Sequence, residues 1–466
     1  MERRRGDLAA NRRGHGLLQG ILGKQRSTVL ALITAFAVAS VLVLVAWHEL
    51  PYRSPDSVWY RQMAAGHADE VVRPYSTRIL HAALIAFLAG PDAAGQETAF
   101  RIVGILSLLL LCGGAALLLR SGGVGLPVVV VLLGVPLFLL LFQDYYLPDL
   151  FHGALLVLFL LTLRRWTWPS LLLLFALVLT RETTALLSLV LIIYALRSGQ
   201  RALALSVAGV TMAGLGLTWF GAARLGLVPS GLTGAVSVEA GRNAHGIGPI
   251  LYLLLKLPFN LLRNLFGLRF WANTLDYCSP TVQWELPRWL ARGAVHAVGF
   301  CGFSILGPLH LASYILTSLG LLPSLALLWI RRGRGLSARG SPAWLQCAWL
   351  YGLLTFLLTP AMGAAMDRII VYGWPAFVLA APLLAVRDGL IPREHLGRLA
   401  ALHLGLSWSP YLLVHLLNDE LMGSHIALVS VLIGIALPLH ALSWKWIGGW
   451  RGIEAAKVVV HPGERA

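Results

Sequence analysis

The chain has 466 residues, of which 57% are hydrophobic and only 12% are charged, so it carries more apolar surface than a soluble domain can bury. Its net charge of +16 does not indicate nucleic acid, because the basic residues stand in short clusters between apolar runs, as in the cytoplasmic loops of membrane proteins. These features exclude a soluble globular enzyme and predict an integral membrane protein with no nucleic-acid partner.

The first apolar run, residues 28–47, is uncharged and follows seven basic residues. As a helix it would cover about 30 Å, which matches the core of a bilayer and exceeds the core of a signal peptide. We therefore predict a retained span and a cytoplasmic N-terminus, residues 1–27. Later apolar runs predict further spans at 99–119, 126–142, 148–163, 168–179, 184–196, 202–220, 311–330, 343–359, 369–386, 399–417 and 425–443.

The predicted fold is all-α, a polytopic transmembrane helix bundle of about twelve spans, with a range of eleven to fourteen. The bundle would fill residues 28–443, and residues 444–466 would form a cytoplasmic tail. Segments assigned to the inside hold 23 of the 37 Lys and Arg but only 6 of the 21 Asp and Glu, as the positive-inside rule requires. Most acidic residues fall on the outer face, in the long loops 48–98 and 221–310 and in short turns, so we expect function there.

The first outer loop is predicted to contain two short interfacial helices. Ser54, Pro55 and Asp56 are typical of a helix start, with Ser54 as N-cap and Pro55 at the first helical position. A second helix is predicted to start at Ser76 or Thr77, because apolar residues then repeat at helical spacing. Neither helix is long enough to cross a bilayer, so the loop is predicted to form a polar strap over the outer mouth of the bundle.

Arg181 and Glu182 occupy a turn between apolar runs of 12 and 13 residues. Helices of that length reach only about 18–20 Å, less than a bilayer core of about 30 Å, so the turn is expected below the outer surface. Charges at that depth persist only inside protein or beside a water-filled cavity, which marks a candidate functional site. The alternative is one kinked helix over 166–196, which would move Arg197 and Arg201 to the outside.

Six further charged residues border apolar runs and are candidate site residues: Asp69, Glu70, Asp144, Asp149, Asp367 and Arg368. The first pair, close to Gly66 and His67, is better explained as a solvated turn in the first loop than as a site. The second pair, in QDYYLPDL, would bind an acceptor or a metal ion, or would simply end a helix pair. The third pair would bind a lipid phosphate, or would be an ordinary interfacial ion pair.

The four cysteines, Cys112, Cys278, Cys301 and Cys347, lack CxxC spacing and predict neither a disulfide framework nor a metal knuckle. A single disulfide between Cys278 and Cys301 on the outer face stays open. The chain contains no GxxxxGK[ST], HExxH or GxSxG sequence, which argues against ATP-driven transport, zinc proteolysis and serine hydrolysis.

The first span, the outer loop with an early acidic residue and the short charged turn together resemble the GT-C class of polytopic membrane glycosyltransferases. The resembling sequences are SPDSVWYRQMAAG, RPYSTRIL, TRETT and MDRIIVYGWPAF. The resemblance implies transfer of a sugar from a polyprenyl-phosphate donor to a glycan, lipid or protein acceptor on the non-cytoplasmic face. The chain lacks the WWD sequence and the large soluble C-terminal domain of the oligosaccharyltransferase branch, so a single-sugar donor is expected.

The resemblance also implies roles for individual residues. Asp56 would be the general base, and Arg78, Arg181 and Arg368 would bind the donor phosphate. The chemistry needs these residue types, because an inverting transfer requires a carboxylate to take the acceptor proton and cations to hold the leaving phosphate. A carboxylate in a first helical turn is also favoured by the helix dipole alone, which is the structural explanation for Asp56. Dependence on a divalent cation stays open.

Two functions from other classes compete with a transferase. A secondary transporter of about twelve spans would show two halves with matching hydropathy and helix breaks, and we find no such halves. A non-catalytic membrane scaffold would scatter the charged residues over separate faces. Arg outnumbers Lys 33 to 4 and no Asn-x-Ser/Thr sequence occurs, which favours a bacterial inner membrane.

Overall fold

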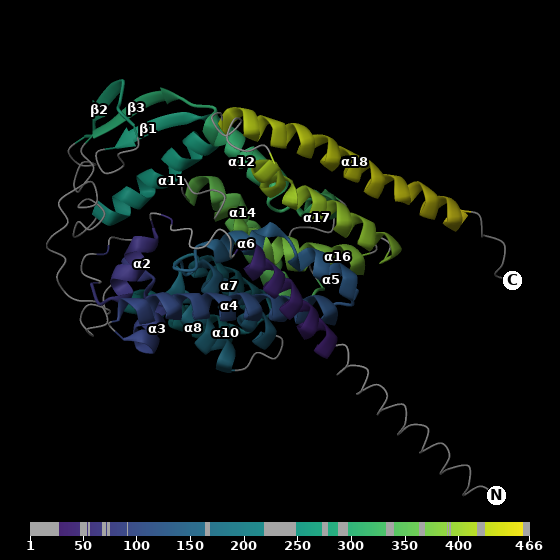
Figure 1. Ribbon diagram of the computed structural model, residues 1–466, viewed down its shortest axis with the longest axis horizontal. Helices are drawn as coiled ribbons and strands as arrows, with labels where there is room; N and C mark the ends of the chain where they lie inside the picture. Colours follow the sequence, from purple (N-terminus) through teal and green to yellow (C-terminus); the bar gives the residue numbers. More distant parts are fainter. Residues whose placement is uncertain are drawn as a thin grey trace, which may run out of the picture.

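The computed structural model describes residues 28–46, 54, 56–67, 71, 75–90, 92–163, 168–218, 248–272, 278–287, 297–331, 340–362, 369–388, 390 and 393–459. The predictions for residues 1–27, Asp69, Glu70, Asp367 and Arg368 lie outside these ranges. The described part is mostly helical and elongated (Figure 1).

The N-terminal half is helical throughout its described ranges. After a first helix, Thr28–Ala46, the elements are α2 (Ser57–Ala64), a 3₁₀ turn η2 (Tyr75–Thr77), α3 (Ile79–Ala89), α4 (Ala93–Ser121), α5 (Leu126–Leu133), α6 (Pro136–Gln143), α7 (Asp149–Thr162), α8 (Trp168–Thr180), α9 (Thr184–Arg197) and α10 (Arg201–Gly216). The two short helices predicted for the first outer loop are thus present as α2 and α3, although α2 begins at Ser57, two residues later than predicted.

The C-terminal half contains both strands and helices. Its elements are α11 (Gly248–Phe266), β1 (Leu268–Ala272), β2 (Val282–Glu285), β3 (Ala297–Phe303), α12 (Leu306–Thr317), α13 (Leu322–Trp329), α14 (Ala343–Met362), η6 (Val371–Gly373), the π-helix η7 (Pro375–Ala380), α16 (Ala381–Arg387), α17 (Arg393–Leu416) and α18 (His425–Val459).

The prediction of about twelve spans is wrong. By length and composition, four described helices can cross a membrane: Thr28–Ala46, Ala93–Ser121, Ala343–Met362 and Ile426–Lys445. The number rises to six if α5 with α6, bent by 46°, and α12 with α13, bent by 81°, each form one span. The other predicted spans correspond mostly to helices of 10–17 residues, which are too short to cross a core of about 30 Å alone. The prediction failed because it counted every apolar run as a crossing.

The all-α prediction is also incomplete, because residues 268–303 contain a three-stranded antiparallel sheet of order β1-β3-β2. Every residue of β2 is exposed, whereas β3 is buried at its start. A disulfide joins Cys278 to Cys301 in β3, with a Cα–Cα distance of 6.1 Å, so the pairing that the sequence left open is present. The sheet rests on one end of the helices, near α11 (Figure 1).

Close approaches between helices hold the bundle together. At Gly114 of α4 a Cβ atom would lie only 2.7 Å from Val157 of α7, so glycine is needed for this contact. The indole N–H of Trp408 in α17 donates to the carbonyl of Gly134, at the bend between α5 and α6, over 2.7 Å. Many apolar side chains remain exposed on the outside, including Phe87, Leu205 and Leu44, which fits a surface in contact with lipid.

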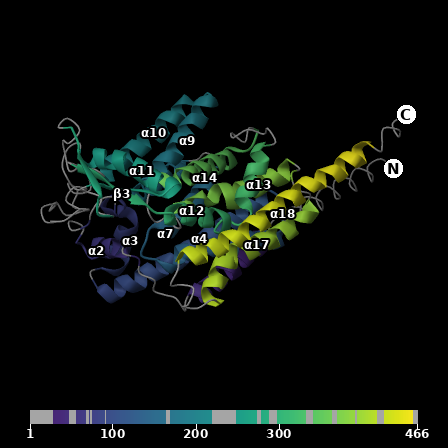
Figure 2. The same ribbon diagram turned by 90° about the horizontal axis from the view of Figure 1, so that it is seen from above.

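Two regions of the bundle lie far apart along its long axis. The helices α2, α3 and the sheet gather at one end, and α5, α16 and the end of α18 lie toward the other (Figure 1). Figure 2 likewise shows α2, α3 and β3 at the end away from the C-terminal end of α18. The candidate site predicted from the sequence belongs to the first end.

Candidate functional site

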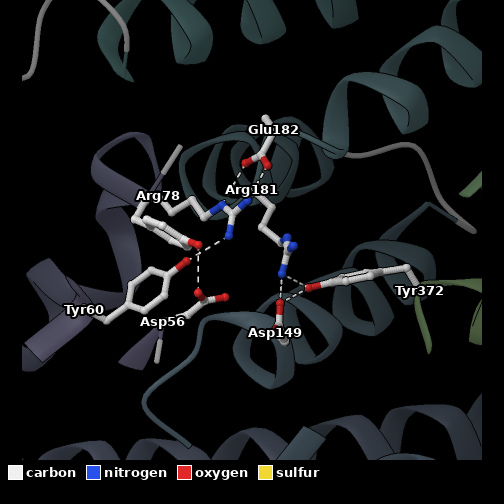
Figure 3. A network of polar contacts seen from close by, with 8 residues as sticks. Asp56, Tyr60, Arg78, Asp149, Arg181, Glu182 and Tyr372 are labelled. Carbon is white, nitrogen blue, oxygen red and sulfur yellow. Dashed lines mark hydrogen bonds and ion pairs between the residues drawn. The ribbon is translucent and has the colours of Figure 1, made fainter. Parts of the chain in front are cut away.

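Side chains from the first loop and from the α8–α9 turn form two neighbouring polar networks, one around Arg78 and Glu182 and one around Arg181 (Figure 3). The two networks meet where Arg181 and Glu182 follow each other in the chain. We use "polar cluster" for Asp56, Tyr60, Tyr75, Arg78, Asp149, Arg181, Glu182 and Tyr372. Four segments far apart in the sequence contribute to it: α2 with η2 and the start of α3, the start of α7, the α8–α9 turn, and η6.

Arg78 links the first loop to the charged turn. Its Nε donates to Oε2 of Glu182 over 2.9 Å, and its Nη2 donates to Oε1, so the contact is bidentate. Its Nη1 donates to the hydroxyl of Tyr60, also over 2.9 Å. The Arg78 side chain is only 6% exposed, whereas Glu182 is 36% exposed. A buried guanidinium held on three nitrogens has a fixed orientation, which suits the recognition of planar acids or phosphates.

Arg181 forms the second ion pair, with Asp149, and both side chains are almost fully buried. Tyr372 joins them, because its hydroxyl accepts from Arg181 Nη1 and donates to Asp149 Oδ1. The guanidinium carbon of Arg181 lies 4.4 Å from the centre of the Tyr372 ring. Asp149 begins α7 and Arg181 follows the last residue of α8, so the two helix dipoles favour a negative and a positive charge at these places.

Asp56 is bound to the cluster through a tyrosine. The hydroxyl of Tyr75 donates to Asp56 Oδ1 over 2.7 Å, and the Tyr75 ring lies under the Arg78 guanidinium at 5.6 Å. Burial, followed by the Asp56 carboxylate, raises the pKa of Tyr75 above its ordinary value, so the phenol keeps its proton and continues to donate. Asp56 is partly accessible, as a residue that meets a substrate needs to be.

Electrostatic attraction keeps Glu182 of the charged turn ionised. Burial raises the pKa of Glu182, but the attraction of Arg78 outweighs it and holds the pKa at about 2. Of the described charged residues in the cluster, three are carboxylates and two are guanidinium groups. A phosphate that entered would therefore have to exchange with an existing partner of an arginine, or meet a further cation from outside the described ranges.

The candidate residues that the structure describes lie close together. Asp56, Arg78, Asp149, Arg181 and Glu182 all belong to the polar cluster. Asp144 lies beside the first loop, because its Oδ2 accepts a hydrogen bond from the backbone N–H of Ser54 over 3.0 Å. Ser54 is two residues before Asp56 in the chain. The candidates Asp69, Glu70, Asp367 and Arg368 are not placed, although η6, which supplies Tyr372, begins three residues after Arg368.

Three tyrosines and a histidine at this site were not among the predicted residues. Tyr60 lies four residues after Asp56 and so on the same side of α2, which was a usable signal. Tyr75 and Tyr372 stand inside the quoted sequences RPYSTRIL and MDRIIVYGWPAF, but nothing in their spacing indicates a shared site. His152 is 1% exposed, with its Nε2 3.1 Å from the hydroxyl of Thr184, immediately beside the cluster.

A metal site is not formed by the described residues, because no three His, Cys, Asp or Glu side chains among them are placed to hold an ion. The chemistry that the described cluster offers is a carboxylate beside two oriented guanidinium groups. Comparisons with protein-family models, curated proteins and solved structures found no match to this chain.

Proposed function

We propose that the protein is a membrane glycosyltransferase of the GT-C type that moves a single sugar from a polyprenyl-phosphate donor to an acceptor, with Asp56 as the base. The observation that carries the proposal is that Asp56 shares one cluster with Arg78 and the Arg181–Glu182 turn (Figure 3). These residues come from segments that are about a hundred positions apart, and a scaffold without a site has no need to gather them.

The chemistry assigns one task to each group. A carboxylate oxygen of Asp56 takes the proton of the acceptor as its nucleophilic atom attacks the sugar carbon. The bond from that carbon to the phosphate oxygen breaks, and the polyprenyl phosphate leaves with the bonding electrons. Arginine guanidinium groups stabilise the charge that develops on the phosphate, which is the largest contribution expected at such a site.

The observed contacts divide the arginines between two tasks. Arg181 is committed to Asp149 and Tyr372 and is nearly inaccessible, which favours a positioning role that holds the turn in place. Arg78 is bound to the more exposed Glu182, so it is better placed to exchange a partner for the donor phosphate. Arg368 is proposed as the additional cation, because the charge of the described cluster leaves a phosphate short of positive charge.

The location of the cluster supports an active face outside the cytoplasm of a bacterial inner membrane. Disulfides persist in oxidising compartments, and the Cys278–Cys301 disulfide belongs to the sheet at the same end of the bundle as α2 and α3 (Figure 1). Polyprenyl-phosphate sugars are donors that a membrane can present on that face.

The test is sugar transfer by the purified protein in lipid vesicles, with tritiated sugars on a set of synthetic polyprenyl-phosphate hexoses and pentoses and with membrane extract as acceptor. Loss of the base by Asp56→Asn should lower the transfer rate by about 100- to 10,000-fold while donor binding is kept. Asp92→Asn, which removes the exposed carboxylate that accepts from Gly95 at the start of α4, is the matched control and should keep full activity.

Full activity of the Asp56→Asn variant would refute the assignment of the base. Absence of transfer by the wild-type protein with every donor would refute the proposed function. Saturable uptake of any of the same sugars into sealed vesicles, without a change in the donor bond, would favour the transporter instead.

A further inference from the structure

A short turn between α6 and α7 contacts both sides of the candidate site. We use "connecting turn" for residues 144–149, which begin at Asp144, the C-cap of α6, and end at Asp149, the first residue of α7. At one end, Asp144 Oδ2 accepts from the backbone N–H of Ser54 over 3.0 Å, and at the other end Asp149 pairs with Arg181. Both carboxylate side chains are buried. The connecting turn therefore ties the start of α2 to the partner of Arg181.

One carboxylate of α4 holds the connecting turn in place. The hydroxyl of Tyr145 donates to Glu97 Oε1 over 2.5 Å, and the hydroxyl of Tyr146 donates to Glu97 Oε2. Both tyrosines are buried, and the centres of their rings lie 4.7 Å apart. Burial, followed by the hydrogen bond to Glu97, raises the pKa of both phenols, so they keep their protons and continue to donate. Glu97 thus fixes two consecutive residues of the turn, directly after Asp144.

The backbone of α4 also comes very close to the connecting turn. A Cβ atom added at Gly104 would lie only 2.9 Å from Cβ of Tyr145, whereas one added at Gly113 of the same helix would lie 3.6 Å from Leu32. The optimal separation of non-bonded carbon atoms is about 3.5–4.0 Å, so only the second position accepts a methyl group without movement. Because Cβ of Tyr145 is attached to the backbone, an alanine at position 104 has to displace the turn itself.

The hydrogen bond between Asp144 and Ser54 acts on the first turn of α2. The carbonyl of Ser54 accepts from the N–H of Ser57 over 2.9 Å and from its hydroxyl over 2.7 Å, so Ser54 is part of the structure that begins the helix. Asp56 stands between these two serines. The place of the Asp56 backbone is therefore set in part by Asp144. A misplacement of about 1 Å can lower the rate of a reaction about 100-fold, so such a contact matters for a base.

We propose that Glu97 and Asp144 are positioning residues: Glu97 fixes the connecting turn, and Asp144 on that turn sets the start of α2 and with it the place of Asp56 relative to Arg181. Of the roles that the sequence left open for Asp144, this one needs a hydrogen-bond acceptor and not a negative charge. The consequence for sugar transfer rests on the proposed function, whereas the hold on α2 does not.

The first experiment is hydrogen exchange of the full-length protein in lipid nanodiscs, read by mass spectrometry. Asp144→Ala removes the acceptor of the Ser54 N–H, so exchange of the amides of 57–64 should rise about tenfold. Exchange of 184–197 should stay at the wild-type rate, whereas a general loss of stability would raise both. Asp144→Asn keeps an oxygen that accepts from Ser54, so its exchange in 57–64 should stay within about threefold of the wild type.

Two matched pairs of variants on α4 test the hold on the connecting turn. Glu97→Gln removes the charge that two phenols share and should raise exchange in 57–64 by about three- to tenfold. Its control is Thr98→Ala, which removes an exposed hydroxyl that donates to the carbonyl of Ala94. Gly104→Ala should act in the same direction as Glu97→Gln, and Gly113→Ala, like Thr98→Ala, should match the wild type. The glycine pair keeps the test decisive if Asp144→Ala fails to fold.

The second experiment is sugar transfer by the same variants. Asp144→Ala should lower kcat by about 10- to 100-fold and leave the KM for the donor within about twofold, because Arg78 is held separately by Glu182. Asp144→Asn should keep most of the activity.

Wild-type exchange of 57–64 in both Asp144→Ala and Gly104→Ala would overturn the positioning role. Loss of transfer in Asp144→Asn with α2 still protected would also overturn it, because Asp144 would then act through its charge. Absence of transfer by the wild-type protein with every donor would refute the proposed function, and the exchange rates would still decide whether Glu97 and Asp144 hold α2.

Discussion

The polar cluster and the apolar cavity around His403, between α5, α13, α16, α17 and α18, differ in how their buried polar groups are satisfied. In the cluster, Arg78 and Arg181 each meet a carboxylate and a tyrosine. In the cavity, both nitrogens of His403 lack a partner among the described residues. The difference implies that a ligand at the cluster has to displace existing contacts, whereas a substitution of His403 breaks no hydrogen bond of its ring among the described residues. Removing a polar group should therefore destabilise the first region and stabilise the second.

The largest effect on stability is expected from Arg181→Met. The substitution leaves the Asp149 carboxylate buried without its guanidinium, so the free energy of unfolding should fall by about 3–5 kcal/mol. Unfolding by SDS in mixed micelles measures this change.

The matched control is Arg101→Met, which breaks a partly exposed Arg–Glu pair with an N–O distance of 3.5 Å between Glu97 and Arg101 on α4. A pair that is open to solvent contributes about 0.2–1 kcal/mol. Equal losses in the two variants would contradict the view that burial makes the Arg181 pair a structural element.

A smaller effect is expected from Glu182→Gln. Glutamine keeps the shape of the side chain but removes the charge that faces Arg78, so the free energy of unfolding should fall by about 1–3 kcal/mol. The released Arg78 should at the same time bind polyprenyl phosphate more tightly, as measured by competition with labelled donor. A gain in affinity without any loss of stability would show that the Arg78–Glu182 pair does not hold the turn.

Much of the cluster was predictable, because charged residues at the ends of apolar runs stand out in a sequence that is otherwise 57% hydrophobic. Arg78, Asp149, Arg181 and Glu182 were found in this way, whereas Asp56 was assigned from the resemblance of the first loop. Their pairing was not predictable, because Arg78 meets a residue 104 positions away and periodicity describes only neighbours within one helix. Tyr372 was missed for the same reason, since a tyrosine beside an apolar run is an ordinary membrane-interface residue.

Helix limits were also better predicted than the number of spans. The runs around Trp168 and Thr184 became α8 and α9 almost residue for residue. The run 311–330 was predicted as one span, but the structure bends it by 81° after α12, where Gly320 adopts a positive φ against His403. The sheet was missed because its paired residues are 12 to 35 positions apart, which a local pattern does not show.

A gain of stability is expected from His403→Phe in lipid-free micelles. The phenyl ring fills the same space without buried unsatisfied nitrogens, so the free energy of unfolding should rise by about 1 kcal/mol. The control is His440→Phe, which should lower it by about 1–2 kcal/mol, because His440 loses its contacts with Ser324 and the Leu316 carbonyl. Loss of stability in both variants would show that His403 has a partner of its own.

The contribution of the Glu182 charge is expected to depend on pH. The pKa of Glu182 is lowered from 4.5 to about 2 in the folded protein, because the Arg78 guanidinium outweighs the effect of burial. A carboxyl whose pKa is lower when folded stabilises the fold above its unfolded pKa, and the contribution is lost as the pH falls toward the folded value. The difference in unfolding free energy between the wild type and Glu182→Gln should thus be constant above about pH 5 and shrink steadily between pH 4.5 and 2. Taking the difference cancels the titration of the other carboxylates. A difference that stays constant down to pH 2.5 would mean that Glu182 makes no charge-dependent bond to Arg78. The stability of the polar cluster would then not depend on this ion pair.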